Sequence, residues 1–404
     1  LHDALPICEN PREFLWNAKP RFGKNLAVYE FIKEYDAAKV LIVTNRPVLA
    51  DGWYKDFGKF TAKNPARNYI FTSNTAKIGT PFDGKLADGQ RLIAFISLQD
   101  LKGAESFGGK TKKRDWIKKG NFSWDILVVD ESHEGVATSK TAAAFENIAR
   151  DFTLYLSGTP FRAIANEDFR TEQIYNWSYL QEQTAKRNFE AEPNPYADKP
   201  RMNLFSYKLS DMILDKISGG TILDGENFDY AFDLNEYFST NGKGKFLHEA
   251  DVKKFLNALT HNEKFPFSTP ELRDELRHTF WLLHRVDSAK AMAKLLKDTP
   301  PFDEYEIVLA AGDGKVDESD EKLNEKSLAR VKEAIASHKK TITLSVGQLT
   351  TGVTVPEWTA VLMLSDIKSA TLYMQAAFRA QNPCRLGDLQ KTNCYVFDFN
   401  PVRT

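Results

Sequence analysis

With 404 residues, of which 42% are apolar, the chain is large enough for two or three packed domains, which excludes a largely disordered protein. A formal net charge of -1 excludes a chain that coats nucleic acid through bulk positive charge, so nucleic-acid binding has to be local. The three cysteines, Cys8, Cys384 and Cys394, lack metal-ligand spacing, which predicts a reduced cytoplasmic protein without a zinc site. No apolar run reaches the roughly 18 residues of a membrane helix, so no membrane partner is expected.

The first part of the chain alternates apolar runs of strand length with segments of helical spacing. We expect strands at 13–18, 39–45, 91–99, 124–131 and 152–160, and helices at 26–35 and 141–150. Such alternation predicts a doubly wound parallel sheet, in a domain that we assign to residues 1–162. The opening residues 1–7 match no start or cap, and we expect them to be foreign to the natural protein.

The composition changes in residues 163–270, where aromatic and acidic residues mix with Pro-rich turns. We expect an insertion or connecting subdomain there, with a strand at 201–209 and a helix at 248–259. The alternation resumes in residues 271–404, which predicts a second α/β sheet. Its expected strands are 278–284, 305–311, 341–347, 359–365 and 393–399, and its expected helices are 287–297, 325–338 and 372–381. Because the chain ends just after a strand, we expect further domains to follow it.

An acidic strand end is the most informative stretch of the sequence. The apolar run 126–129 is followed directly by Asp130 and Glu131, then by His133, which is typical of a buried strand that delivers two carboxylates to the carboxyl edge of a parallel sheet. Carboxylates at that edge can hold Mg²⁺ and activate water. A buried strand that ends in a solvated acidic turn gives the same pattern, so other motifs have to decide. No second His follows at helical distance, which argues against His133 as a zinc ligand.

A lysine loop between the first strand and the first helix provides a candidate phosphate site. Backbone N–H groups and a helix N-terminus converge there, and Gly23-Lys24 supplies the close approach and the cation of the Walker A pattern. The match is imperfect, because Ala18 replaces the first glycine and Asn25 replaces the hydroxyl residue that binds Mg²⁺. The candidate binding residues are Pro20, Arg21, Phe22, Gly23, Lys24 and Asn25.

A rival Gly-Lys-Thr lies at 109–111, at the end of the segment 104–111. No strand runs directly into it, and it lies too close to Asp130 for the intervening strands of a nucleotide-binding sheet. We therefore favour Lys24 as the phosphate lysine.

Three further motifs follow in order: Ser157-Gly158-Thr159, the segment 347–358 (GQLTTGVTVPEW) and the segment 373–383 (YMQAAFRAQNP). With Lys24 and the acidic strand end, this series resembles superfamily 2 DEAD/DEAH-box helicases and translocases, above all the helicase subunits of type III restriction enzymes and related restriction or phage-defence helicases. The resemblance implies an α/β fold of two RecA-like parallel-sheet domains of the P-loop NTPase type, with a mixed insertion between them. It also implies ATP and Mg²⁺ as cofactors.

The resemblance assigns roles position by position. Lys24, Asp130 and Glu131 match the ATP site of the first domain, with Asp130 and Asn25 as Mg²⁺ ligands, directly or through water. Gln375 and Arg379 match the last motif, whose arginine reaches the γ-phosphate across the cleft between the domains. A second arginine usual in that motif is replaced by Asn382. His133 would report the nucleotide state to the coupling residues Ser157, Gly158 and Thr159.

Nucleic-acid contacts in such proteins come from loops at the motifs, which agrees with the neutral charge. The matching positions are Thr44, Asn45, Arg46, Ser97, Gln99, Thr350, Thr351 and Gly352. Ordinary turn and cap chemistry explains each of them singly as well as nucleic-acid contact does. The resemblance implies duplex DNA as the partner, and a nuclease or a methyltransferase/specificity unit as a further partner.

The leading hypothesis is therefore an ATP hydrolase, a DNA-stimulated helicase or translocase core of a restriction or phage-defence system. A nucleotide-gated nucleic-acid-binding module with little hydrolysis is an alternative, because Asn25 and Asn382 each replace an expected group. An RNA helicase shares every one of these motifs and stays open as well.

Overall fold

The chain forms two compact units, Leu1–Asn188 and Phe189–Thr404. The computed structural model describes residues 12–45, 47–73, 78–82, 84–103, 117, 122–130, 145–159, 168–207, 233–242, 244–311, 321–350, 353–387 and 389–400.

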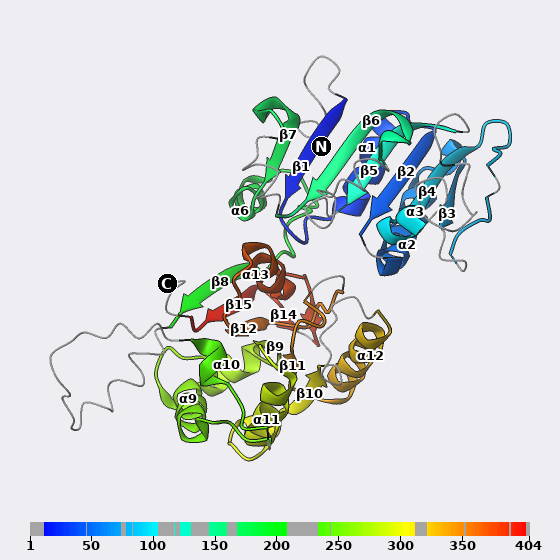
Figure 1. Ribbon diagram of the computed structural model, residues 1–404. Helices are drawn as coiled ribbons and strands as arrows, with labels where there is room; N and C mark the ends of the chain where they lie inside the picture. Colours follow the sequence, from blue (N-terminus) through cyan, green and yellow to red (C-terminus); the bar gives the residue numbers. More distant parts are fainter. Residues whose placement is uncertain are drawn as a thin grey trace. The chain divides into compact units, whose positions relative to one another are not determined.

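The first unit is built on one sheet of seven strands in the order β3-β4-β2-β5-β6-β1-β7, and every pair of neighbours runs parallel. Figure 1 shows β7 at one edge of this sheet and β3 at the other. The strands are β1 (Glu13–Ala18), β2 (Lys39–Thr44), β3 (Tyr69–Ser73), β4 (Arg91–Ser97), β5 (Ser123–Asp130), β6 (Ala149–Ser157) and β7 (Ile174–Trp177). The helices are α1 (Lys24–Glu34), α2 (Ala50–Lys63), α3 (Leu98–Gly103) and α6 (Tyr179–Asn188).

Both faces of this sheet are buried, which explains why its inner strands are continuous apolar runs rather than alternating patterns. Ile42 and Val128 belong to a cluster that packs against Phe31 of α1 and Trp53 of α2. Their neighbours in the strands point to the opposite face, where a second cluster includes α3 residue Leu101. The sheet is therefore covered on both sides.

The described elements of the first unit differ from the expected ones in several places. The helices α2, α3 and α6 were not among the expected elements. The short edge strands β3 and β7 were not predicted. Both contain strand-favouring residues, but they are only five and four residues long, and β7 is mostly half-buried. The helix expected at 141–150 is wrong at its end, where Ala149 and Arg150 begin β6 and pair with Ser123 and Trp124 of β5. Pairing with a central strand overrides the helical preference of such residues.

The second unit has a six-stranded sheet in the order β10-β11-β9-β12-β15-β8, again with parallel neighbours throughout. Its strands are β8 (Arg201–Ser206), β9 (His278–Leu283), β10 (Glu306–Ala310), β11 (Thr341–Ser345), β12 (Ala360–Leu364) and β15 (Asn393–Asp398). Its helices are α8 (Leu234–Tyr237), α9 (Glu249–His261), α10 (Pro270–Glu275), α11 (Val286–Lys297), α12 (Glu321–Ser337) and α13 (Ala370–Ala377). The two-residue strands β13 (Arg385–Leu386) and β14 (Leu389–Gln390) form a separate antiparallel pair.

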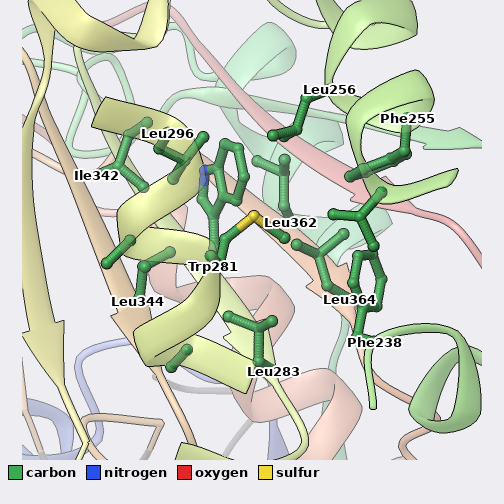
Figure 2. Packing of buried hydrophobic residues seen from close by; sticks show 14 of the residues in the cluster. Phe238, Phe255, Leu256, Trp281, Leu283, Leu296, Ile342, Leu344, Leu362 and Leu364 are labelled. Atoms are coloured by element: carbon green, nitrogen blue, oxygen red, sulfur yellow. The ribbon is translucent and has the colours of Figure 1, made fainter. Parts of the chain in front are cut away.

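One face of the second sheet carries the larger core of this unit. Figure 2 shows Trp281 of β9 and Leu362 of β12 among side chains that include Leu256 of α9 and Leu296 of α11. The opposite face has its own cluster, in which Phe280 and Trp358 lie 4.6 Å apart between ring centroids. Two parallel sheets with helices confirm the predicted α/β class.

The described elements of residues 163–270 are divided between the two units. β7 pairs with β1 in the first sheet, and β8 pairs with β15 in the second. The strand expected at 201–209 and the helix expected at 248–259 are present as β8 and α9. The domain boundaries at 162 and 270 stay predictions.

A search of the described residues for a helix that is both long and apolar enough to cross a membrane found none.

His278 makes the stability of the second unit depend on pH. The side chain lies in the sheet, 5% exposed, with Nδ1 3.0 Å from Thr341 Oγ1. Burial, with a smaller effect of Arg277, lowers the pKa of His278 from 6.5 to about 4. The unfolded chain therefore takes up a proton at a higher pH than the folded chain does, so stability is lost as pH falls from about 6.5 towards 4.

We predict that the His278→Asn variant loses less stability on acidification than the wild type does. The difference should be about 2 kcal/mol between pH 7 and pH 5. Denaturant unfolding of both proteins at the two pH values measures it. An identical pH dependence in the two proteins would rule out His278 as the cause.

Candidate functional site

The carboxyl edge of the first sheet gathers polar residues at the ends of neighbouring strands. Thr44, Ser97, Asp130 and Ser157 are the last residues of β2, β4, β5 and β6, and all four are buried. The register pairs Thr44 with Ser97 on one side and with Asp130 on the other. Because the strands are parallel, residues far apart in the sequence meet at one edge, where ligands of such sheets bind.

The loop between β1 and α1, residues 19–23, has the backbone geometry of an anion site. Gly23 caps α1 in the left-handed conformation, with φ of 96°, and no acidic residue occupies the first turn of the helix. The first N–H groups of a helix lack partners within the helix and carry partial positive charge, so they favour an anion. No heavy atom lies within 4 Å of a Cβ built on Gly23, so the glycine is needed for its φ rather than for space.

Lys24 and Asp130, which the sequence predicted to share a site, are brought together. Lys24 Nζ lies 3.4 Å from Asp130 Oδ1, and the two side chains are 13% and 8% exposed. Two opposite charges that are this well buried stabilise each other's charged forms. A cation and a carboxylate therefore face each other beside the N-terminus of α1.

Asn25 points to a different carboxylate from the one that the metal prediction implies. Its Nδ2 donates to Asp56 Oδ2 of α2 at 3.3 Å. An ionised carboxylate only accepts hydrogen bonds, so the NH₂ of the amide faces Asp56 and the amide oxygen Oδ1 is turned away from it. Asp56 thus fixes which way the amide lies. The Mg²⁺ role of Asn25 stays a prediction.

The predicted coupling segment lies against the lysine loop. The Oγ of Ser157 accepts a hydrogen bond from the backbone N–H of Thr159 at 3.1 Å, which shapes the turn after β6. A Cβ built on Gly158 would lie 3.1 Å from Pro20 Cδ and 3.2 Å from Ala18 O. Only a glycine leaves this approach undistorted, so the turn and the loop come into close contact at this position.

The sequence reasoning missed a second support of the loop, formed by β7 and α6. Lys19 N–H donates to Trp177 O at 2.9 Å, and the rings of Phe22 and Trp177 lie 5.8 Å apart. Lys19 Nζ lies 3.0 Å from Glu182 Oε2. The one available sequence signal was the pair Ser178 and Gln181, which cap α6 reciprocally.

The candidate nucleic-acid residues of the first unit lie at the same edge but have local roles as well. Ser97 Oγ donates to Asp100 Oδ2 at 2.9 Å and accepts from Asp100 N–H, which is cap chemistry at the start of α3. Thr44 is buried and Asn45 is half-buried. Several predicted residues lie outside the described residues: Arg46, Glu131, His133, Thr351 and Gly352, together with the side chain of Gln99. The rival segment 104–111 lies outside them too.

Arg379 is bound within its own unit. The side chain is 4% exposed, Nε donates to Thr350 O at 2.6 Å, and Nη1 donates to Val353 O. Asn382 Nδ2 donates to Arg379 O at 3.0 Å. Gln375 lies half-buried on α13, which Ser369 caps by accepting from Leu372 N–H. Arg379 therefore ties the segment 347–358 to the last motif in this structure, and its role towards a γ-phosphate stays a prediction.

Known proteins with related sequences come from restriction systems. Residues 10–162 match the family described as "Type III restriction enzyme, res subunit". The chain is 28% identical, over 457 aligned positions, to a protein of Mycoplasma pneumoniae named "Putative type II restriction enzyme and methyltransferase RM.MpnORF110P C-terminus". That alignment covers 98% of this chain and 62% of the relative, so the chain spans less than two thirds of the relative's length.

Solved structures give the same picture of the fold. The ATP-dependent Type ISP restriction-modification enzyme LlaBIII bound to DNA is similar with a TM-score of 0.57 and 14% identity, over 98% of this chain and 27% of that one. The predicted resemblance to superfamily 2 helicases of restriction systems is confirmed. The two parallel sheets are consistent with RecA-like domains. S. cerevisiae Dbp5 bound to RNA and ADP BeF3 is also similar, with 12% identity over 98% of this chain and 82% of Dbp5. Its TM-score of 0.48 is too low to decide between RNA and DNA.

The contact between Gly158 and the loop can be tested by adding one methyl group. We predict that the added methyl group of Gly158→Ala displaces Pro20 and weakens ADP binding about tenfold. Overpacking of this kind costs roughly 1–3 kcal/mol, and about 1.4 kcal/mol corresponds to a tenfold change in affinity. Titration with a fluorescent ADP analogue measures the affinity. Gly58→Ala in α2 is the control, because no heavy atom lies within 4 Å of its added Cβ. Equal affinities of the two variants would show that the contact does not shape the loop.

Proposed function

We propose that this chain is the ATP-hydrolysing motor core of a restriction enzyme and moves along or remodels duplex DNA. The observation that carries the proposal is the approach of Lys24 Nζ to Asp130 Oδ1, 3.4 Å, beside the N-terminus of α1. A cation, a carboxylate and the first N–H groups of a helix at one sheet edge are what binding and cleaving a nucleoside triphosphate require.

The residues present fit ATP and Mg²⁺. Gly23 has a left-handed backbone conformation, and the first turn of α1 carries no acidic residue. The N–H groups of this turn can therefore bind the phosphates, and Lys24 adds a positive charge. Asp130 would hold Mg²⁺. Asn25 would offer its Oδ1 to the ion, because the NH₂ group of Asn25 is directed to Asp56 instead. Bound Mg²⁺ neutralises the charge that develops on the phosphoryl oxygens. Glu131 would polarise the attacking water, and Gln375 and Arg379 would complete the site from the second domain.

DNA is the proposed partner for two reasons. The similar proteins include a restriction-modification enzyme bound to DNA and a protein named as a putative restriction enzyme and methyltransferase. The near-zero net charge agrees with contacts from a few loop residues to the phosphate backbone, which position a protein without reading sequence. A nuclease or methyltransferase unit would be the further partner, and the cytoplasm the proposed location.

The alternative, a nucleotide-gated binding module with little hydrolysis, is favoured by two contacts. Asn25 is engaged with Asp56, and the Arg379 guanidinium is engaged with two carbonyls of its own unit. Neither contact prevents binding of nucleotide or DNA. For fast hydrolysis the Arg379 contacts would have to yield, and the Asn25 amide oxygen would have to do the work of the missing hydroxyl.

The leading proposal predicts that ATP turnover is present, rises on adding duplex DNA more than on adding RNA, and depends on Lys24. Lys24→Met should lower turnover on the order of 10²-fold or more, because it removes a charge that stabilises the transition state. Glu131→Gln should lower it by a similar factor while ADP still binds.

Phosphate release with and without each nucleic acid measures the effect. Lys55→Met is the matched control, because Lys55 is an exposed lysine of α2. Absence of turnover above background in the wild type, under every condition, would refute the enzymatic proposal.

Asn25→Thr separates the two functions. If the chain is a working motor, restoring the hydroxyl changes DNA-stimulated turnover by less than about tenfold, which is a small part of the barrier. A larger rise, with DNA binding in the presence of ATP already normal in the wild type, would favour the binding module instead.

A further inference from the structure

Helix α6 is attached to the first unit in an unusual way. All ten of its residues are described. Its Leu180 side chain is 69% exposed, whereas Glu182 is buried. Glu182 is the residue of the helix that is fully buried. Most surface helices bury an apolar stripe, whereas the fully buried residue of this helix is a carboxylate.

One partner of that carboxylate is Lys19, the first residue of the loop 19–23 between β1 and α1, called the phosphate loop below. Lys19 Nζ and Glu182 Oε2 lie 3.0 Å apart, and the two side chains are 4% and 1% exposed. Lys19 Nζ also donates to Pro20 O at 3.2 Å, so the ammonium is tied to the loop backbone as well as to α6. The way α6 docks therefore depends on the position of the loop.

A buried ion pair makes this attachment sensitive to geometry. Removing one partner leaves the other charge buried and unpaired, which is strongly unfavourable. When the loop is ordered in one position, the ammonium is fixed and α6 has a defined partner. When the loop fluctuates, the pair lengthens and α6 is held less firmly. Ordering of the loop and docking of α6 thus favour each other, and such a linkage acts equally in both directions.

The position of α6 in the chain gives this linkage a consequence. The helix ends at Asn188, and the second unit begins at the next residue, Phe189. It is therefore the helix through which the described chain leaves the first unit. Any pull on that connection reaches α6 before it reaches the sheet.

We propose that Glu182 is a positioning residue that, through Lys19, couples occupancy of the phosphate loop to the docking of α6 at the connection between the two domains. The inference rests on the proposed function, because it needs a nucleotide at the loop. It adds a route by which the second domain senses that nucleotide.

Hydrogen exchange with mass spectrometry on the full chain tests the coupling. In the wild type, saturating ADP should slow amide exchange in residues 179–188 about tenfold, which lies within the usual range of couplings between sites. In Glu182→Gln this effect of ADP should disappear, and ADP affinity should fall by a similar factor. A helix that serves only to stabilise the fold would not respond to ADP in either protein.

Glu333→Gln is the matched control, because Glu333 is an exposed glutamate of α12 in the second unit. If Glu182→Gln does not fold, Glu182→Asp keeps the charge and lengthens the pair, and should show a smaller ADP effect on α6 than the wild type. A wild type that binds ADP while α6 exchange is unchanged would overturn this inference alone. A wild type that binds no ADP would overturn the proposed function together with it.

Discussion

The contact between Lys24 and Asp130 depends on a constraint that governs the whole first unit, namely that all neighbouring strands run parallel. β6 lies between β5 and β1, so the carboxylate at the end of β5 and the helix after β1 are separated by one strand. The long Lys24 side chain spans this gap. The intervening β6 must then turn away without filling the space above the edge, and Gly158, with no side chain, lets it do so.

This constraint also explains which features could be predicted from the sequence. Buried inner strands are continuous apolar runs, so β1, β2, β4, β5 and β6 could be found from the sequence. In the structure, the order of these strands within the sheet brings Lys24 close to Asp130. The edge strands β3 and β7 have only five and four residues, too few to show such a run, and they were missed. The contacts of Asn25 with Asp56 and of Lys19 with Glu182 depend on how α2 and α6 dock. No spacing in the sequence encodes such docking.

In the second unit, Arg379 shows how a motif residue can be recognised while its contacts are not. The motif implied a partner outside the unit, but the guanidinium donates to the carbonyls of Thr350 and Val353. Hydrogen bonds from arginine to phosphate are charge-assisted and stronger than those to neutral carbonyls. Under the proposed function, a phosphate would compete with these two carbonyls for the guanidinium. Arg379 would then no longer hold the segment 347–358, which carries candidate nucleic-acid residues.

The sheet order also decides what restrains the phosphate loop. β1 has β6 on one side and β7 on the other, and the loop after β1 is contacted by the turn after β6 and by the helix after β7. In the turn, Gly158 lies against Pro20, and in the helix α6, Glu182 holds Lys19. The first contact is steric and nearly rigid, whereas the second is an ion pair that weakens as it lengthens. On this second side the hydrogen bond from Lys19 N–H to Trp177 O of β7 restrains the loop together with the ion pair to α6. In the chain, α6 is followed directly by the second unit.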